Sequence, residues 1–199
     1  MTLADTSHAI HKCCNALANH YGLPEVSHEL ALSSMGMTIE DSWRLYWGDY
    51  KEEWVDYYRS QLRGKEQSGT QLFPNAVSAL ERLRSSGTIT GVVSNRRFAA
   101  RVVGNMGLTP YMDVIVGLED VDRAKPDPQA LIKAMEKLGV GAEETLYVGD
   151  TDIDMLAAKN ASVRGVGMTT GNFGRNALLA AGAWRVCDDL GELPEITKG

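Results

Sequence analysis

The chain has few cysteines and no long apolar run. Only three of its 199 residues are cysteine, and their spacing, with Cys13 next to Cys14 and Cys187 far away, matches neither a disulfide framework nor a zinc site. Reduced thiols and the lack of a signal-peptide pattern at the N-terminus predict a cytoplasmic protein. No apolar run approaches the length of a membrane span, so we expect no membrane partner.

An excess of positive charge is also absent. The formal net charge is −6, which argues against a general nucleic-acid-binding surface. An anionic substrate would therefore need a locally positive pocket. The length is sufficient for one sizeable core together with a smaller second module. This composition is consistent with a soluble enzyme.

Helix and strand patterns alternate from residue 72 onward. Buried β-branched segments predict strands, and amphipathic segments ending near glycine predict helices. The expected strands are 88–93, 114–117, 145–148, 163–168 and 184–186; the expected helices are 75–86, 98–106, 128–138, 176–181 and one that follows residue 150. This alternation predicts an α/β fold with a parallel sheet and helices on both faces.

The first third of the chain has a different pattern. Helices are expected at 5–20 and 39–62, and no strand pattern precedes residue 72. The second helix is rich in tryptophan and tyrosine, which favours a packing surface over a binding site. We predict a separate helical module at residues 7–71 that ends in the polar, glycine-containing stretch 64–71, followed by a core at 72–199.

An acidic turn follows the expected strand 145–148. Asp150, Asp152 and Asp154 alternate there, immediately before an alanine-rich helix. Asp150, Thr151 or Asp152 could cap that helix. A calcium loop would need glycine at its sixth position and glutamate at its twelfth, where this chain has Met155 and Ala161. A calcium loop is therefore excluded, and a magnesium half-site at a strand end remains alongside capping.

Polar residues follow two other expected strands. Ser94 and Asn95 come after strand 88–93, and Lys125 lies between an acidic loop and a helix start fixed by proline. In isolation, the first pair is typical of a turn and the lysine of a surface. However, the carboxyl ends of parallel strands meet at one sheet edge. There, Ser94 and Asn95 would hold phosphate oxygens, and Lys125 would neutralise carboxylates and phosphate.

Together these segments resemble motifs II, III and IV of the haloacid dehalogenase-like hydrolases. The matching residues are Ser94-Asn95, Lys125-Pro126-Asp127-Pro128 and Gly149-Asp150-Thr151-Asp152-Ile153-Asp154, in the family's order and spacing. The resemblance covers nearly the whole chain and is greatest to the phosphoglycolate phosphatase branch. It implies a Rossmann-like core at 72–199 and a small helical cap at 7–71.

The resemblance also implies a reaction and residue roles. The family's phosphatases hydrolyse small phosphorylated metabolites with Mg²⁺, through an aspartyl-phosphate. By resemblance, Asp150 binds the metal, and Asp154 supports that site directly or through water. Ser94 holds a phosphate oxygen with Asn95 beside it, and Lys125 neutralises nucleophile and phosphate. A phosphomutase stays possible, because the cap decides between the two activities.

The family's first motif matches only in part. It reads Asp-x-Asp-Gly-Thr-Leu-x-Asp-Ser, and residues 1–6 fit its second half, with Asp5 as the late aspartate and not the nucleophile. The two catalytic aspartates and the central first strand are thus expected before residue 1. We therefore predict that this chain is inactive by itself. Its unpaired central strands would favour association into a homo-oligomer.

Two explanations of the partial first motif are open. The start site is placed too late and the parent protein is an active enzyme, or the chain is a truncated homologue. In the second case it is inactive as a phosphatase and serves as a phosphate-, metabolite- or protein-binding module.

Overall fold

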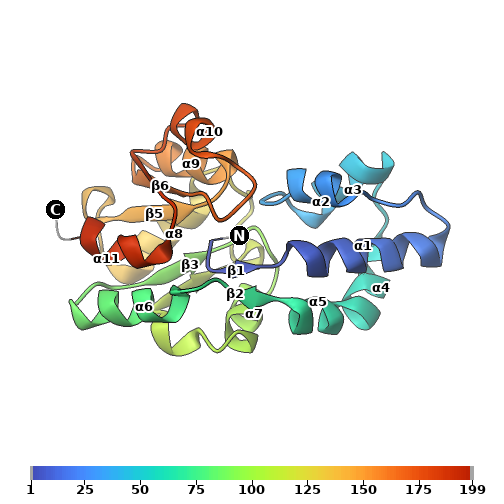
Figure 1. The fold of residues 1–199 in the computed structure, drawn as a ribbon, viewed down its shortest axis with the longest axis horizontal. Coiled ribbons are helices and arrows are strands. Elements are labelled where there is room, and N and C mark those ends of the chain that lie inside the picture. Colours follow the sequence, from blue (N-terminus) through green and yellow to red (C-terminus); the bar gives the residue numbers. More distant parts are fainter. Residues whose placement is uncertain (1, 198–199) are drawn as a thin grey trace.

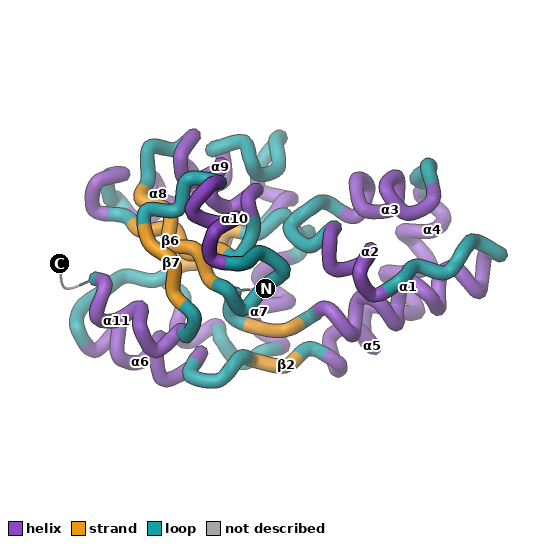
Figure 2. Tube along the Cα trace, turned by 45° about the horizontal axis from the view of Figure 1, so that its top comes forward, coloured by secondary structure: helices purple, strands orange, loops and turns teal. Residues whose placement is uncertain are grey.

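The structure is a computed structural model that describes residues 2–197. Its strands gather in one part of the molecule, and the other part consists of helices (Figures 1 and 2). The fold class is α/β with parallel strands, as predicted. None of the described helices is long and apolar enough to cross a membrane.

The parallel strands form two separate sheets. One contains β3 (Gly91–Val93) and β4 (Val114–Val116); the other contains β5 (Leu146–Gly149), β6 (Arg164–Met168) and β7 (Arg185–Cys187). In the described residues, β3 pairs with β4 alone, and β5 pairs with β6 alone. In this structure the parallel strands of the core are therefore split between β3 and β5.

Helices cover both faces of these strands (Figure 1). One face carries α6 (Ala76–Ser85), α7 (Ala99–Asn105) and α11 (Leu193–Ile196), and the other carries α8 (Gln129–Leu138), α9 (Asp152–Asn160) and α10 (Arg175–Ala180). The strand period of two places neighbouring side chains on opposite faces. Val92 packs with α6 and α7, whereas Val93 packs with α8. Short 3₁₀ helices complete this part: Thr109–Tyr111, Leu118–Asp120, Ala142–Glu144 and Leu190–Glu192.

The helical part differs from the sequence prediction. It consists of α1 (Ser7–Tyr21), α2 (His28–Ser33), α3 (Ile39–Trp47), α4 (Glu52–Tyr57), a π-helical turn (Tyr58–Leu62) and α5 (Arg63–Gly69). The single helix expected at 39–62 is wrong, because Gly48 takes a left-handed conformation (φ 72°) and ends α3. Most of the stretch 64–71 is helical, and neither α2 nor α11 was predicted.

A two-stranded ribbon connects the two parts. Strand β1 (Ala4–Asp5) pairs antiparallel with β2 (Gln71–Leu72), so the chain enters and leaves the helical part side by side. The expectation that no strand precedes residue 72 was wrong. Each strand has only two residues, too few for a hydrophobic period to mark it.

The aromatic residues of the helical part form its core. Trp43, Trp54 and Tyr58 are buried and pack with Leu17 and Leu62. Rings meet edge to face, as Trp43 and Tyr58 do with centroids 5.7 Å apart. The stripe is thus a packing surface, as the sequence favoured.

We expect Trp43→Ala to lower the free energy of unfolding by about 3–5 kcal/mol, because Trp43 is 2% exposed at the centre of this cluster. The matched control is Trp184→Ala, whose ring is 47% exposed and should cost less than about 1 kcal/mol. Urea denaturation followed by far-ultraviolet circular dichroism measures both. Equal effects of the two substitutions would contradict the packing assignment.

Candidate active site

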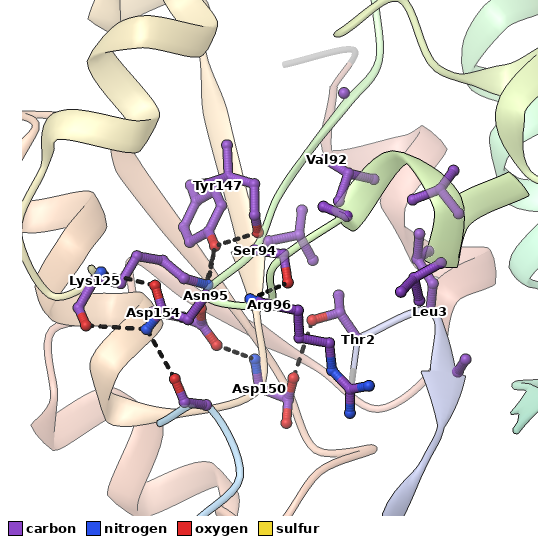
Figure 3. A pocket seen from close by; sticks show the side chains of 18 of the residues that line it. Thr2, Leu3, Val92, Ser94, Asn95, Arg96, Lys125, Tyr147, Asp150 and Asp154 are labelled. Atoms are coloured by element: carbon purple, nitrogen blue, oxygen red, sulfur yellow. Dashed lines mark hydrogen bonds and ion pairs between the residues drawn. The ribbon is translucent and has the colours of Figure 1, made fainter. Parts of the chain in front are cut away.

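Three loops meet at the carboxyl edge of the strands (Figure 3). Ser94 follows β3, Lys125 lies on the connection after β4, and Asp150 follows β5. All three line one cavity of about 850 Å³. The structure therefore brings the residues singled out in the sequence to one place, at the sheet edge where α/β folds bind ligands.

The strongest contact at this edge joins Lys125 and Asp154. Lys125 Nζ lies 2.6 Å from Asp154 Oδ1, and the two side chains are 7% and 8% exposed. Lys125 also donates to the Tyr147 hydroxyl (2.7 Å), which donates to the same carboxylate oxygen (3.1 Å). Burial alone would raise the pKa of Asp154, but the ammonium outweighs it and lowers that pKa to about 2. The carboxylate likewise holds the pKa of Lys125 above its ordinary value despite burial, so both groups are charged.

The second oxygen of Asp154 shapes the turn that carries Asp150. Oδ2 accepts from the Thr151 hydroxyl (2.8 Å) and from the backbone N–H groups of Asp150 and Thr151 (3.2 Å each). Thr151 Oγ1 in turn accepts from Asp154 N, which completes a capping box at the start of α9. Gly149 is required for this close approach, since a Cβ there would lie 2.3 Å from that of Asp154.

Asp150 is buried at the wall of the cavity. Asp150 is 1% exposed, and its Oδ1 accepts a hydrogen bond from the Thr2 hydroxyl at 3.0 Å. Gly171 packs against the carboxylate so closely that a Cβ would lie 2.2 Å from Oδ2. Neighbours on two sides thus fix the direction of this carboxylate.

Ser94 and Asn95 differ in what they present to the cavity. Ser94 Oγ accepts from Arg96 N (3.1 Å), and its hydroxyl hydrogen can still donate. The Asn95 amide accepts from Lys125 N (2.8 Å) and donates to Lys125 O (3.1 Å) and to Gly36 O (2.9 Å). Asn95 therefore fixes the Lys125 backbone and attaches the helical part to the site. Its predicted contact with phosphate stays a prediction.

A second, half-buried ion pair links the two parts beside the cavity. Arg96, directly after Asn95, contacts Glu66 of α5, and Tyr58 donates to the other Glu66 oxygen at 2.8 Å. Burial favours neutral Glu66, but Arg96 holds its pKa below the ordinary value. Arg96 also donates to Thr6 Oγ1 (3.3 Å), directly after β1. It therefore contacts residues near both points where the chain passes between the two parts.

Sequence reasoning missed Tyr147 and Arg96. Tyr147 carries the one hydroxyl inside β5, on the strand face that also holds Gly149. That position in the sequence could have identified it as a residue near the Asp150 turn. Of the three capping candidates predicted from the sequence, Thr151 is the one that caps α9, three residues before Asp154, which is the spacing of a capping box. No sequence signal pairs Arg96 with Glu66, because the two residues are 30 positions apart.

The donor set fits a magnesium ion only in part. In the described part of the chain, no group of three or more His, Cys, Asp or Glu side chains could hold a metal. Mg²⁺ needs only one or two protein carboxylates when water and phosphate oxygens complete its shell, and Asp150 fits that use. From the sequence, Asp154 was expected to support the metal site either directly or through water. Both of its oxygens accept hydrogen bonds from protein groups, so support through water suits this geometry.

We expect Asp154→Asn to destabilise the protein by about 3–5 kcal/mol, because it leaves the Lys125 ammonium buried without its counter-charge. Asp152→Asn, in the same first turn of α9, is the matched control and should change stability by less than about 1 kcal/mol. Chemical denaturation at pH 7 measures both. Similar losses for both variants would show that the ion pair does not set stability.

The same pair predicts acid sensitivity. The folded-state pKa of Asp154, about 2, lies below its ordinary value of 3.8. The contribution of Asp154 to the free energy of unfolding is therefore complete above about pH 5 and falls as the pH drops through 4 towards 2. Between pH 6 and 3, we expect the wild type to lose on the order of 1 kcal/mol more than Asp154→Asn, measured by urea denaturation at each pH. Parallel pH profiles would contradict this assignment.

Comparison with known proteins places this geometry in a family. A family model described as haloacid dehalogenase-like hydrolase matches residues 1–168. A phosphoglycolate phosphatase of Yersinia pestis is 30% identical over 189 residues, which cover 87% of this chain and 79% of that protein. A phosphoglycolate phosphatase of Salmonella typhimurium is 30% identical over 162 residues, covering 80% of this chain but 58% of that relative.

Solved structures agree on the fold. A predicted phosphoglycolate phosphatase from Haemophilus somnus gives a TM-score of 0.87 at 21% identity, over 98% of this chain and 93% of that one. A haloacid dehalogenase-like family hydrolase from Streptococcus pneumoniae gives 0.84 at 23% identity, with the same two coverages, 98% and 93%. Because the family model matches residues 1–168, the chain belongs to the haloacid dehalogenase-like hydrolase family.

Proposed function

We propose that this chain carries the phosphate- and Mg²⁺-binding machinery of a phosphatase that acts on a small phosphorylated metabolite. The observation that carries the proposal is the buried, charged Lys125, held by Asp154 on the cavity that Ser94 and Asp150 also line. A fixed cation beside a hydroxyl donor and a carboxylate suits a phosphoryl group that is held with a metal ion. The phosphoglycolate phosphatase of Yersinia pestis supports the same reaction class.

In this proposal each side chain of the site has a separate role. Ser94 donates its hydroxyl hydrogen to a phosphate oxygen, and Lys125 supplies positive charge. Asp150 would hold Mg²⁺. When bound, the ion would screen the repulsion between phosphate and carboxylate and polarise the phosphoryl group. Asp154 acts through Lys125 and through the Asp150 turn, while Asn95 positions the Lys125 backbone.

Residues 7–71 act as a cap over a core at 72–199 in this proposal. The cavity extends from the strand ends into the helical part, where Met37, Ile39, Trp43 and Tyr46 line it. A substrate held by phosphate at the strand ends would place its remaining atoms against these side chains. The cap would therefore select the metabolite, and the same selection would distinguish a phosphatase from a phosphomutase.

We further propose that this chain does not complete the reaction by itself. Glu66 lines the cavity but is paired with Arg96, and Asp5 accepts from the backbone and hydroxyl of Ser7. Asp150 and Asp154 are committed to the metal and to Lys125. The second candidate function is thus a phosphate- or metabolite-binding module, which uses the same residues without turnover.

Binding is tested first. We expect Mg²⁺ and inorganic phosphate, supplied together at about 100 times the dissociation constant that titration gives, to stabilise the protein by roughly 2.7 kcal/mol. Asp150→Asn should remove the magnesium-dependent part, whereas Asp152→Asn should keep it. Thermal unfolding and titration calorimetry measure these effects. If Asp150→Asn binds Mg²⁺ as the wild type does, Asp150 is not the metal ligand.

Turnover is tested separately. With p-nitrophenyl phosphate and Mg²⁺, we expect no phosphate release above the rate of the buffer, because Glu66, Asp5 and Asp154 are held in other contacts and Asp150 is assigned to the metal. The assay uses the chain of 199 residues. Turnover at an enzymatic rate, on the order of 1 per second or more, that Asp150→Ala abolishes would overturn this part of the proposal.

A further inference from the structure

A second groove lies on the surface where the helical part meets the core, beside α5 and α7 (Figure 1). Arg59 of the π-helical turn and Arg63 of α5 line it from the helical part, and Phe98 and Arg101 line it from the core. Arg59 and Arg63 also line the active-site cavity, whereas Phe98 and Arg101 do not. The groove is therefore a separate site that shares one wall with the cavity, and we call it the arginine groove.

Phe98 brings two of these arginines together across the boundary between the parts. Its backbone has a left-handed conformation (φ 60°), which is uncommon for a bulky residue, and its N–H donates to Glu119 Oε2 at 2.7 Å. The ring is 45% exposed. The guanidinium carbons of Arg63 and Arg101 lie 5.1 and 5.2 Å from its centre. One exposed ring thus contacts a guanidinium of the helical part and a guanidinium of the core.

The positive charge at this end of the groove has no paired carboxylate. Within residues 2–197, the guanidinium groups of Arg59, Arg63 and Arg101 form no ion pair, and Arg59 Nε is buried without a hydrogen-bond partner. Burial lowers the pKa of Arg63, and the charges of Arg101 and Arg59 lower it further, although Glu66 opposes them. Three like charges therefore repel one another here, and a bound anion would relieve that repulsion.

Carboxylates at the other end of the groove limit the size of that anion. Glu53 and Asp56 line the groove beside Tyr21. Desolvation raises the pKa of the Tyr21 hydroxyl, and the nearby charges of Glu53 and Asp56 raise it further. A long polyanion laid along the groove would meet these carboxylates, whereas a compact anion beside Phe98 would not. The charge pattern thus favours a small molecule over a nucleic acid or an acidic peptide.

We propose that the arginine groove binds a compact anion with two adjacent phosphate groups, either free pyrophosphate or the diphosphate end of a nucleotide. Each guanidinium presents its N–H donors as a planar fork that matches phosphate oxygens. Two phosphate groups together carry about three negative charges near pH 7, which equals the charge of the three guanidinium groups.

The bound anion joins the two parts of the molecule. It contacts Arg59 and Arg63 of the helical part and Arg101 of the core, so it strengthens the boundary that the Arg96–Glu66 pair already spans. Binding in the arginine groove does not depend on the phosphatase proposal.

Titration calorimetry in EDTA tests the ligand class with pyrophosphate, ADP and inorganic phosphate. We expect pyrophosphate or ADP to bind with a dissociation constant below about 100 μM, and inorganic phosphate to bind at least about tenfold more weakly. Binding of pyrophosphate alone would identify the free anion as the ligand, and similar or tighter binding of ADP would identify a nucleotide. No saturable binding of either up to about 1 mM would overturn the proposal.

Arginine substitutions locate the site. Arg101→Ala should weaken binding at least about tenfold. The matched control is Arg185→Ala, because Arg185 also lies 5.2 Å from an exposed ring, that of Trp184, but outside the groove. It should leave the affinity unchanged, as should Ser94→Ala in the active site. Equal effects of the two arginine substitutions, or loss of binding in Ser94→Ala alone, would contradict the assignment.

Hydrogen exchange tests the contact with both parts. The bound anion should protect amides of segments 59–66 and 98–105 together in the wild type, and this protection should be lost in Arg101→Ala. Protection confined to segments 94–96 and 150–154 would place the anion in the active site instead and overturn the proposal. Thermal unfolding without ligand should give Arg101→Ala and Arg185→Ala similar midpoints, since both side chains are exposed.

Discussion

The arrangement of the site depends on one buried ion pair, between Lys125 and Asp154. Placing two charges in a poorly hydrated site is costly unless they meet closely and their remaining hydrogen-bonding capacity is used. Here both conditions hold, since the 2.6 Å contact is accompanied by bonds from Tyr147, Thr151 and the Asp150 backbone. The pair ties the loop after β4 to the start of α9. Lys125 and the turn that aims Asp150 are consequently parts of one structure, and loss of either charge would disturb both.

The helical part is attached to this same structure. Asn95 holds both backbone groups of Lys125 and also donates to Gly36 O, so the loop before α3 is one bond away from the lysine. Arg96 makes a second link, to Glu66 of α5. The position of the helical part over the cavity and the position of the lysine are thus coupled through two consecutive residues. That coupling gives a physical route by which contacts made in the helical part reach Lys125.

The sequence predicted the α/β class and brought Ser94, Lys125 and Asp150 into one pocket, because a parallel sheet aligns the residues that follow its strands. Most helix and strand positions followed from hydrophobic period and glycine stops. Other features depend on tertiary contact. The Arg96–Glu66 pair joins residues of different elements, and the ribbon of β1 and β2 is too short for a pattern. The break at Gly48 was hidden by strong aromatic periodicity on both sides, although glycine often ends a helix.

The split between β3 and β5 bears on the active site as well as on stability. Both strands end at the residues that would hold phosphate and metal, and each is supported by a neighbouring strand on one edge only in the described structure. Within the described residues, the contacts of Lys125 with Tyr147 and Asp154 join the loop after β4 to β5 and to α9. Since Ser94 and Asp150 immediately follow the ends of β3 and β5, the spacing between the hydroxyl donor and the carboxylate depends on these side-chain contacts rather than on a ladder between the two strands.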